Sequence, residues 1–126
     1  MRNPMTNQEA WNLYEKYLAG WKAISDEKRT KIVEELVAED VQYCTPRHKS
    51  GGRKTIIEDM AAFQEKFSRG HFDVEDVSAH HEVALLTWVL VQADGNIFAK
   101  GYDQILVSSE GKIISLTTFA PSVLKL

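Results

Sequence analysis

Cysteine is almost absent from this chain, and its scarcity excludes two kinds of structure. Cys44 is the single cysteine in 126 residues. An internal disulfide needs two cysteines, and a metal cluster held by cysteines alone needs more, so the sequence can form neither. A lone thiol also suits a reducing compartment.

Positive charge and long apolar runs are lacking as well. The net charge is −3 and the pI is about 5.8, which gives no electrostatic attraction to nucleic acid or to an anionic membrane. Residues 1–10 contain no apolar signal core. The longest apolar run, residues 83–91, includes Thr87 and is far too short to span a bilayer. We therefore expect a cytoplasmic protein without nucleic-acid or membrane partners.

No internal repeat, low-complexity segment or interdomain linker divides the chain. Its 126 residues are 44% hydrophobic and 26% charged, which is ordinary for a globular chain and enough to bury a core. We expect a single domain over residues 1–126, with a folded core at about 8–120.

The first part of the chain predicts two helices. Thr6 and Glu9 have the spacing of a capping box. Apolar residues then recur at helical spacing, namely Trp11, Tyr14, Leu18 and Trp21. Asp26 is the expected N-cap of a second helix, which the pair Glu39-Asp40 would end.

A short strand and a third helix come next. We predict a strand at residues 41–45, stopped by Pro46. A basic, Gly-containing loop follows at residues 47–52, and we expect it to be solvated. The third helix carries an apolar stripe, made of Ile56, Met60, Phe63 and Phe67.

From residue 71 onward the apolar period changes to two, which predicts strands. These strands cover residues 72–81, 83–91, 97–108 and 112–120, and turn signals separate them. Helices grouped before an antiparallel sheet indicate the α+β class. We expect a cone-shaped barrel, in which a curved, mainly antiparallel sheet packs on three helices. The open mouth of such a cone is a usual place for a ligand.

Asp103 interrupts one of these strands on the face that should turn inward. Residues 101, 103, 105 and 107 share that face. A carboxylate there is costly unless it is hydrogen-bonded, protonated or used. No basic residue shares the face, so desolvation predicts a raised pKa for Asp103. The alternative is a structural carboxylate satisfied by a tyrosine or a backbone amide.

Several motifs, in this order and spacing, resemble the nuclear transport factor 2-like superfamily and its bacterial SnoaL-like proteins. They include Ala38-Glu39-Asp40, His80-His81 before the strand with Trp88, Gly101-x-Asp103, the turn Glu110-Gly111-Lys112-Ile113 and a last strand ending at Phe119. The match covers roughly residues 8–120. It implies a cystatin-like cone that is usually dimeric, and a superfamily in which enzymes and non-catalytic binding modules share one fold.

The resemblance implies three catalytic candidates. Asp103 is placed like the protonated aspartate of ketosteroid isomerase, and Tyr17 lies near the position of a first-helix tyrosine of that enzyme. SnoaL-like cyclases pair an aspartate with a nearby histidine, and His81 with Asp103 is similar. The isomerase's general base has no counterpart, because Thr45 stands in its place. A rim or dimer-contact histidine is the alternative for His81.

Aromatic residues are the candidates for the walls of the pocket. Residues predicted to bind substrate are Trp88, Tyr14, Tyr43, Phe63 and Phe67, and the alternative for Trp88 is a core residue. The histidines lack metal-ligand spacing, so neither a metal nor another cofactor is expected. An epoxide hydrolase would need a second carboxylate and an inward arginine, which the strand pattern does not place.

Two functions from different classes follow. The leading hypothesis is a SnoaL-like pocket protein for an apolar small molecule, which as an enzyme would be a cofactor-independent isomerase, cyclase or dehydratase. The second is a non-catalytic ligand-binding or dimerisation module. Residues 83–91 are apolar at almost every position, so both faces of that strand need a cover. We therefore predict a homodimer through the convex side of the sheet.

Overall fold

A computed structural model describes residues 4–120 of the chain. The elements follow in the order α1 (Asn7–Leu18), η1 (Ala19–Trp21), α2 (Asp26–Leu36), β1 (Val37–Cys44), α3 (Arg53–Lys66), β2 (His71–His80), β3 (Val83–Val91), β4 (Ile97–Val107) and β5 (Ile113–Phe119). The sheet order is β1-β5-β4-β3-β2, with only β1 and β5 parallel. The expected α+β fold and mainly antiparallel sheet are confirmed, although the sheet curves without closing into a barrel.

Local capping explains where the first two helices begin. Thr6 and Glu9 form the predicted capping box at α1. The predicted N-cap of α2 is wrong, because Ser25 rather than Asp26 accepts the backbone N–H of Lys28. Serine caps well because its short side chain reaches the orphan donors of the first turn.

The end of α2 also differs from the prediction. The helix ends at Leu36, and Glu39 and Asp40 lie inside β1 rather than closing the helix. Both side chains are exposed. β1 is an edge strand with an irregular register between Val37 and Gln42, and edge strands tolerate charges that a central strand would not.

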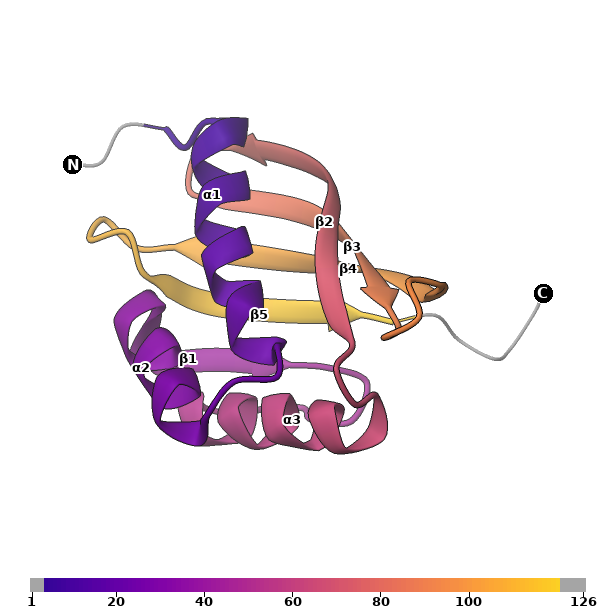
Figure 1. Ribbon diagram of the computed structural model, residues 1–126. Helices are drawn as coiled ribbons and strands as arrows, with labels where there is room; N and C mark the ends of the chain where they lie inside the picture. The colour runs from indigo at the N-terminus through magenta and orange to yellow at the C-terminus, as the bar shows by residue number, and fades with distance from the viewer. Residues whose placement is uncertain (1–3, 121–126) are drawn as a thin grey trace.

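The concave face of the sheet has the composition that the alternation predicts. Gly101, Asp103, Ile105 and Val107 are all buried. Helix α1 crosses this face, whereas α2 and α3 lie beside β1 (Figure 1). The three helices thereby cover the concave side, and no helix within residues 4–120 covers the convex side of the same strands.

The convex face carries exposed apolar side chains. Leu85 is 46% exposed, Tyr102 50% and Phe119 55%. Tyr102 pairs directly with Phe119 and with Thr87, so these side chains lie on one face. Among the described helices, none is long and apolar enough to cross a membrane.

Candidate functional site

A cavity of about 400 Å³ opens between the concave face of the sheet and the helices. An aromatic belt forms much of its wall, made of Trp21, Phe63, Phe67, Phe72 and Trp88. These rings contact one another edge to face or tilted, with Phe63 and Phe72 centroids 4.5 Å apart. The cavity therefore offers an apolar body of the right size for a small organic molecule.

Asp103 projects into this cavity from β4. Its carboxyl Oδ2 accepts a hydrogen bond of 2.6 Å from the Tyr14 hydroxyl on α1. Oδ1 is buried and has no hydrogen-bond partner among residues 4–120. Thr118 and Trp88 lie near enough to affect the carboxyl, but neither meets the geometry of a hydrogen bond, so the hydrogen-bonding capacity of Oδ1 is unused within residues 4–120.

Burial controls the pKa of Asp103. Desolvation is the largest effect, and it raises the pKa from 3.8 to about 6 even though Tyr14, Thr118 and Trp88 each lower it. The side chain is 5% exposed, and a buried carboxylate without a cationic partner favours its neutral form. The group can therefore act near neutral pH either as a proton donor or as a hydrogen-bond donor.

Tyr14, rather than Tyr17, makes the contact with Asp103. Tyr17 lies one helical turn further along α1 and stacks on Tyr14 at 5.8 Å. Its hydroxyl is buried without a hydrogen-bond partner in the described part of the chain, and Tyr17 does not line the cavity. Burial raises the pKa of Tyr17 well above 10.0, and Asp103 adds to the rise. The catalytic role predicted for Tyr17 stays a prediction, to be tested together with that of Tyr14.

His81 is not brought together with Asp103. It is exposed in the turn between β2 and β3, with φ of +50°, and its Nδ1 lies 2.9 Å from Nδ1 of His80. Asp103 faces the middle of β3, where it pairs with Leu86, and His81 does not line the cavity. The structure thus places His81 in an exposed turn outside the cavity lining, because the turn takes it out of the alternation of the strand. The catalytic role predicted for His81 stays a prediction.

A second carboxylate, which the sequence interpretation missed, lines the cavity from α3. Asp59 Oδ2 accepts a 2.7 Å hydrogen bond from the Tyr43 hydroxyl. His48 Nε2 lies 3.0 Å from Asp59 Oδ1, and Arg47 lies 3.9 Å from the same oxygen. Arg47 and Lys49 are exposed, as expected for a solvated loop, whereas His48 is partly buried against Asp59.

A signal for Asp59 exists in the sequence. Ile56, Asp59, Met60 and Phe63 have the spacing i, i+3, i+4 and i+7, and all four are buried. The helical period alone places Asp59 on the inward side of α3. The rule for an inward charge thus applies to this helix as it does to the strand of Asp103.

The five residues predicted to bind substrate all line the cavity. They are Trp88, Tyr14, Tyr43, Phe63 and Phe67. Burial raises the pKa of the Tyr43 hydroxyl far above 10.0, with contributions from Tyr17 and Asp59, so the phenol remains a hydrogen-bond donor. Their contact with a ligand stays a prediction. Within residues 4–120, no three His, Cys, Asp or Glu side chains are grouped so that they could hold a metal ion.

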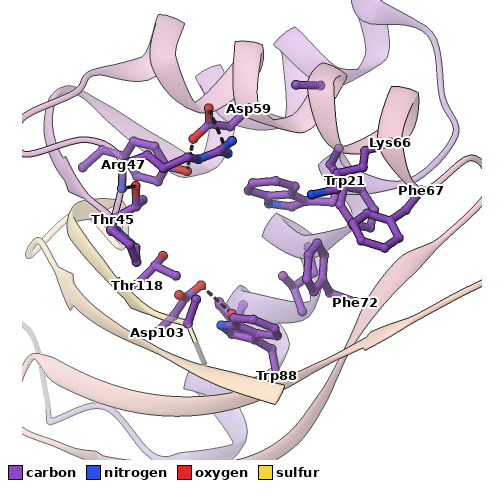
Figure 2. Close-up of a pocket in the computed structure, with 17 residues that line it drawn as sticks. Trp21, Thr45, Arg47, Asp59, Lys66, Phe67, Phe72, Trp88, Asp103 and Thr118 are labelled. Atoms are coloured by element: carbon purple, nitrogen blue, oxygen red, sulfur yellow. Dashed lines mark hydrogen bonds and ion pairs between the residues drawn. The ribbon is translucent and has the colours of Figure 1, made fainter. Parts of the chain in front are cut away.

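An open α+β cone with a cavity between its sheet and helices, and with two hydrogen-bonded carboxylates in the wall, defines a class of small pocket proteins. Figure 2 shows this arrangement, with Asp59 and Arg47 on one side of the cavity and Asp103, Thr118 and Trp88 on the other. No protein-family model matches the chain, and no curated protein matches its sequence. Solved structures do match.

One similar structure is a candidate isomerase of the SnoaL-like family from Agrobacterium tumefaciens, 25% identical, with a TM-score of 0.82, over 91% of this chain and 99% of that chain. Another is a candidate SnoaL-like polyketide cyclase from Jannaschia sp., which is 17% identical and has a TM-score of 0.72; the match covers 95% of this chain and 90% of that chain. A candidate ketosteroid isomerase from Kribbella flavida is 20% identical and has a TM-score of 0.65; the match covers 95% of this chain and 83% of that chain. The chain therefore has the nuclear transport factor 2-like fold, and its structure is similar to those of SnoaL-like proteins.

Proposed function

We propose that this protein binds an apolar, carbonyl-bearing small molecule in its cavity and transfers protons on it without a cofactor. Asp103 is the acid or hydrogen-bond donor, and Tyr14 holds its other oxygen. The observation that supports this role is the free Oδ1 of a buried carboxyl in an aromatic cavity. The isomerases and the polyketide cyclase among the similar structures agree with it.

The chemistry follows from the state of Asp103. A carboxyl with a pKa of about 6 is partly neutral near pH 6, and a neutral carboxyl can donate from Oδ1 while Oδ2 accepts from Tyr14. A carbonyl oxygen is the matching acceptor. The hydrogen bond strengthens as negative charge develops on that oxygen, which is how such donors accelerate enolisation.

Thr45 favours a second candidate, a non-catalytic binding module. It occupies the place where the resemblance led us to look for a general base. Its Oγ1 instead accepts the backbone N–H groups of Arg47 and His48, both at 3.1 Å. Thr45 therefore organises a turn, and a protein lacking any other base would bind the carbonyl compound without converting it.

Binding of a probe ketone tests the proposed site. The bicyclic ketone 2-tetralone has an apolar body and one carbonyl, and Trp21 and Trp88 in the wall report its binding by fluorescence. Asp103→Leu keeps the size of the side chain but removes its hydrogen-bond donor, so it should weaken binding at least about tenfold. Asp40→Asn, which neutralises an exposed carboxylate on β1, is the matched control. Equal affinity in all three proteins would exclude Asp103 from the site.

We also propose that the protein is a homodimer through the convex side of the sheet. Leu85, Tyr102 and Phe119 lie there with about half of each side chain in contact with solvent. Exposed apolar groups on one continuous face are typical of an interface. A second copy of the same sheet would cover them without interfering with the cavity on the opposite face.

A further inference from the structure

Asp59 is a buried carboxylate that the proposed role of Asp103 does not use. Its side chain is 11% exposed and lines the cavity. Each of its neighbours is a donor or a cation: the Tyr43 hydroxyl at 2.7 Å, the His48 ring at 3.0 Å and the Arg47 guanidinium at 3.9 Å. Groups of this kind orient a carboxylate as an acceptor, whereas the buried Oδ1 of Asp103 has no hydrogen-bond partner among residues 4–120.

The two carboxylates belong to one cavity but to different elements. Asp59 comes from α3 and Asp103 from β4, and Figure 2 shows them on opposite sides of the open space. Both raise the pKa of Tyr17, so each lies within electrostatic reach of the same phenol. Because both carboxylates line the cavity, a small molecule that fills it can touch both.

The loop that follows β1 supports Asp59 rather than supplying a base of its own. The backbone N–H of Thr45 donates to the His48 carbonyl at 2.8 Å, and the Thr45 hydroxyl accepts the His48 N–H. These bonds hold the loop so that the His48 ring lies against Asp59 and over Tyr43, with ring centroids 6.1 Å apart. Tyr43 and His48 are thus positioning residues for Asp59.

We propose that Asp59 is the general base of this cavity, acting opposite Asp103 on a ketone or aldehyde that bears a hydrogen on the carbon beside its carbonyl group. This inference rests on the proposed function, because it needs the carbonyl oxygen at Asp103. Asp59 would supply the general base that is missing at Thr45. With this base the protein is an enzyme, and without it the protein is a passive binding module.

The proton transfers balance without a co-reactant. The Asp59 carboxylate takes a proton from the carbon beside the carbonyl, and the released electron pair forms the carbon–carbon double bond. The carbonyl π electrons move to oxygen, which takes the proton of the neutral Asp103 carboxyl. Asp59 then returns its proton to the same or another carbon of the enol system, and Asp103 recovers the hydroxyl proton.

Deuterium incorporation into 2-tetralone in D₂O, followed by proton NMR and corrected for exchange without protein, tests the proposal. The parent should accelerate exchange beside the carbonyl. Asp59→Asn should lower the protein-dependent rate by about 10² or more, the usual contribution of a general base, while fluorescence still reports 2-tetralone binding. Asp59→Glu keeps the charge but moves the carboxylate by about 1 Å, which should cost up to about 10² in rate.

Glu58→Gln is the matched control, because Glu58 is the exposed neighbour of Asp59 on the same helix. It should exchange at the parental rate.

Full exchange in Asp59→Asn, or no catalysed exchange in a parent that binds 2-tetralone, would overturn Asp59 as base and leave the binding site in place. Loss of exchange in both Asp59 variants with binding retained supports it. If Asp59→Asn does not fold, Asp59→Glu decides alone, and a parental rate there overturns the proposal. A parent that does not bind 2-tetralone removes the proposed function and this inference with it.

Discussion

The two faces of strands β3 and β4 differ in the kind of side chain that each buries or exposes. On the concave face, Trp88 and Asp103 are buried, and Gly101 lies beneath the indole ring. On the convex face of the same strands, Leu85 and Tyr102 are about half exposed. The strands thus bury a carboxyl group, which costs free energy, and expose apolar side chains, which then contribute little to stability.

This inversion shows where function sits in the sheet. A buried carboxyl that lacks one partner reduces stability, and such groups persist where a ligand uses them. Exposed apolar side chains on a regular face gain stability only when another surface covers them. The two faces of the sheet suit the two proposed partners: a small molecule on the concave side and a second copy of the chain on the convex side.

The largest effect should come from Gly101, where the concave face has no room. A Cβ at this position would lie 2.1 Å from Trp88 Cζ2 and 2.5 Å from the Phe119 carbonyl oxygen. Because backbone and a packed ring must both move, we expect Gly101→Ala to destabilise the fold by about 3 kcal/mol or more. Urea unfolding measures this, and an unchanged midpoint would show that the concave wall is not tightly packed.

Asp103→Asn should have the next largest effect, and it should stabilise. The folded pKa of about 6 lies above the ordinary 3.8, so the neutral acid is the favoured native form. Ionisation then destabilises the parent as pH rises through 3.8, and the cost stays constant above about 6. The gap between those values corresponds to roughly 3 kcal/mol at neutral pH.

Unfolding free energies of the parent and of Asp103→Asn, measured from pH 3 to pH 8, check this. The two curves should nearly coincide below the ordinary pKa and separate between about pH 4 and pH 6. Destabilisation of the variant at neutral pH would instead identify Asp103 as an ionised structural residue. The site built on it would then have to be abandoned.

Phe63→Ala should have a smaller effect on stability than a core phenylalanine normally would. Phe63 is 8% exposed and packs on Trp21, Phe67 and Phe72, but it also lines the cavity. A fully packed phenylalanine costs about 3–5 kcal/mol, and fewer contacts are lost beside an open space. We expect a loss of about 2 kcal/mol in unfolding free energy, measured by chemical denaturation. A loss of about 3–5 kcal/mol would instead mean that the cavity is closed at this wall.

The smallest change in protomer stability should come from the convex face. Leu85→Lys and Tyr102→Lys place charges on exposed positions, so protomer stability should change by about 0.5 kcal/mol or less. The same changes should dissociate the proposed homodimer, because a charge would be buried in the interface. Light scattering at micromolar concentration measures the mass, and a parent that is already a monomer contradicts the dimer.

Much of the fold could be predicted because its signals are local or periodic. Thr6 and Glu9 begin α1 through bonds three residues apart, and the bounds of β3 were predicted to the residue. The alternation also placed Asp103 inside. Predictions failed where tertiary contacts decide, as at Glu39 and Asp40, which lie in β1 between the positions that pair in parallel with β5.

The site divides in the same way. By itself the sequence determined that a carboxylate would lie in an apolar interior, because a period of two is a property of any strand. It also held the helical spacing that turns Asp59 inward.

Only the tertiary structure decided the partners: Tyr14 for Asp103, and Tyr43 with His48 for Asp59. Those pairs join residues from different elements, up to 89 positions apart for Tyr14 and Asp103, and their geometry depends on how the helices pack across the sheet. His81 shows the converse, since a turn with φ of +50° removed it from the face that its place in the sequence had suggested.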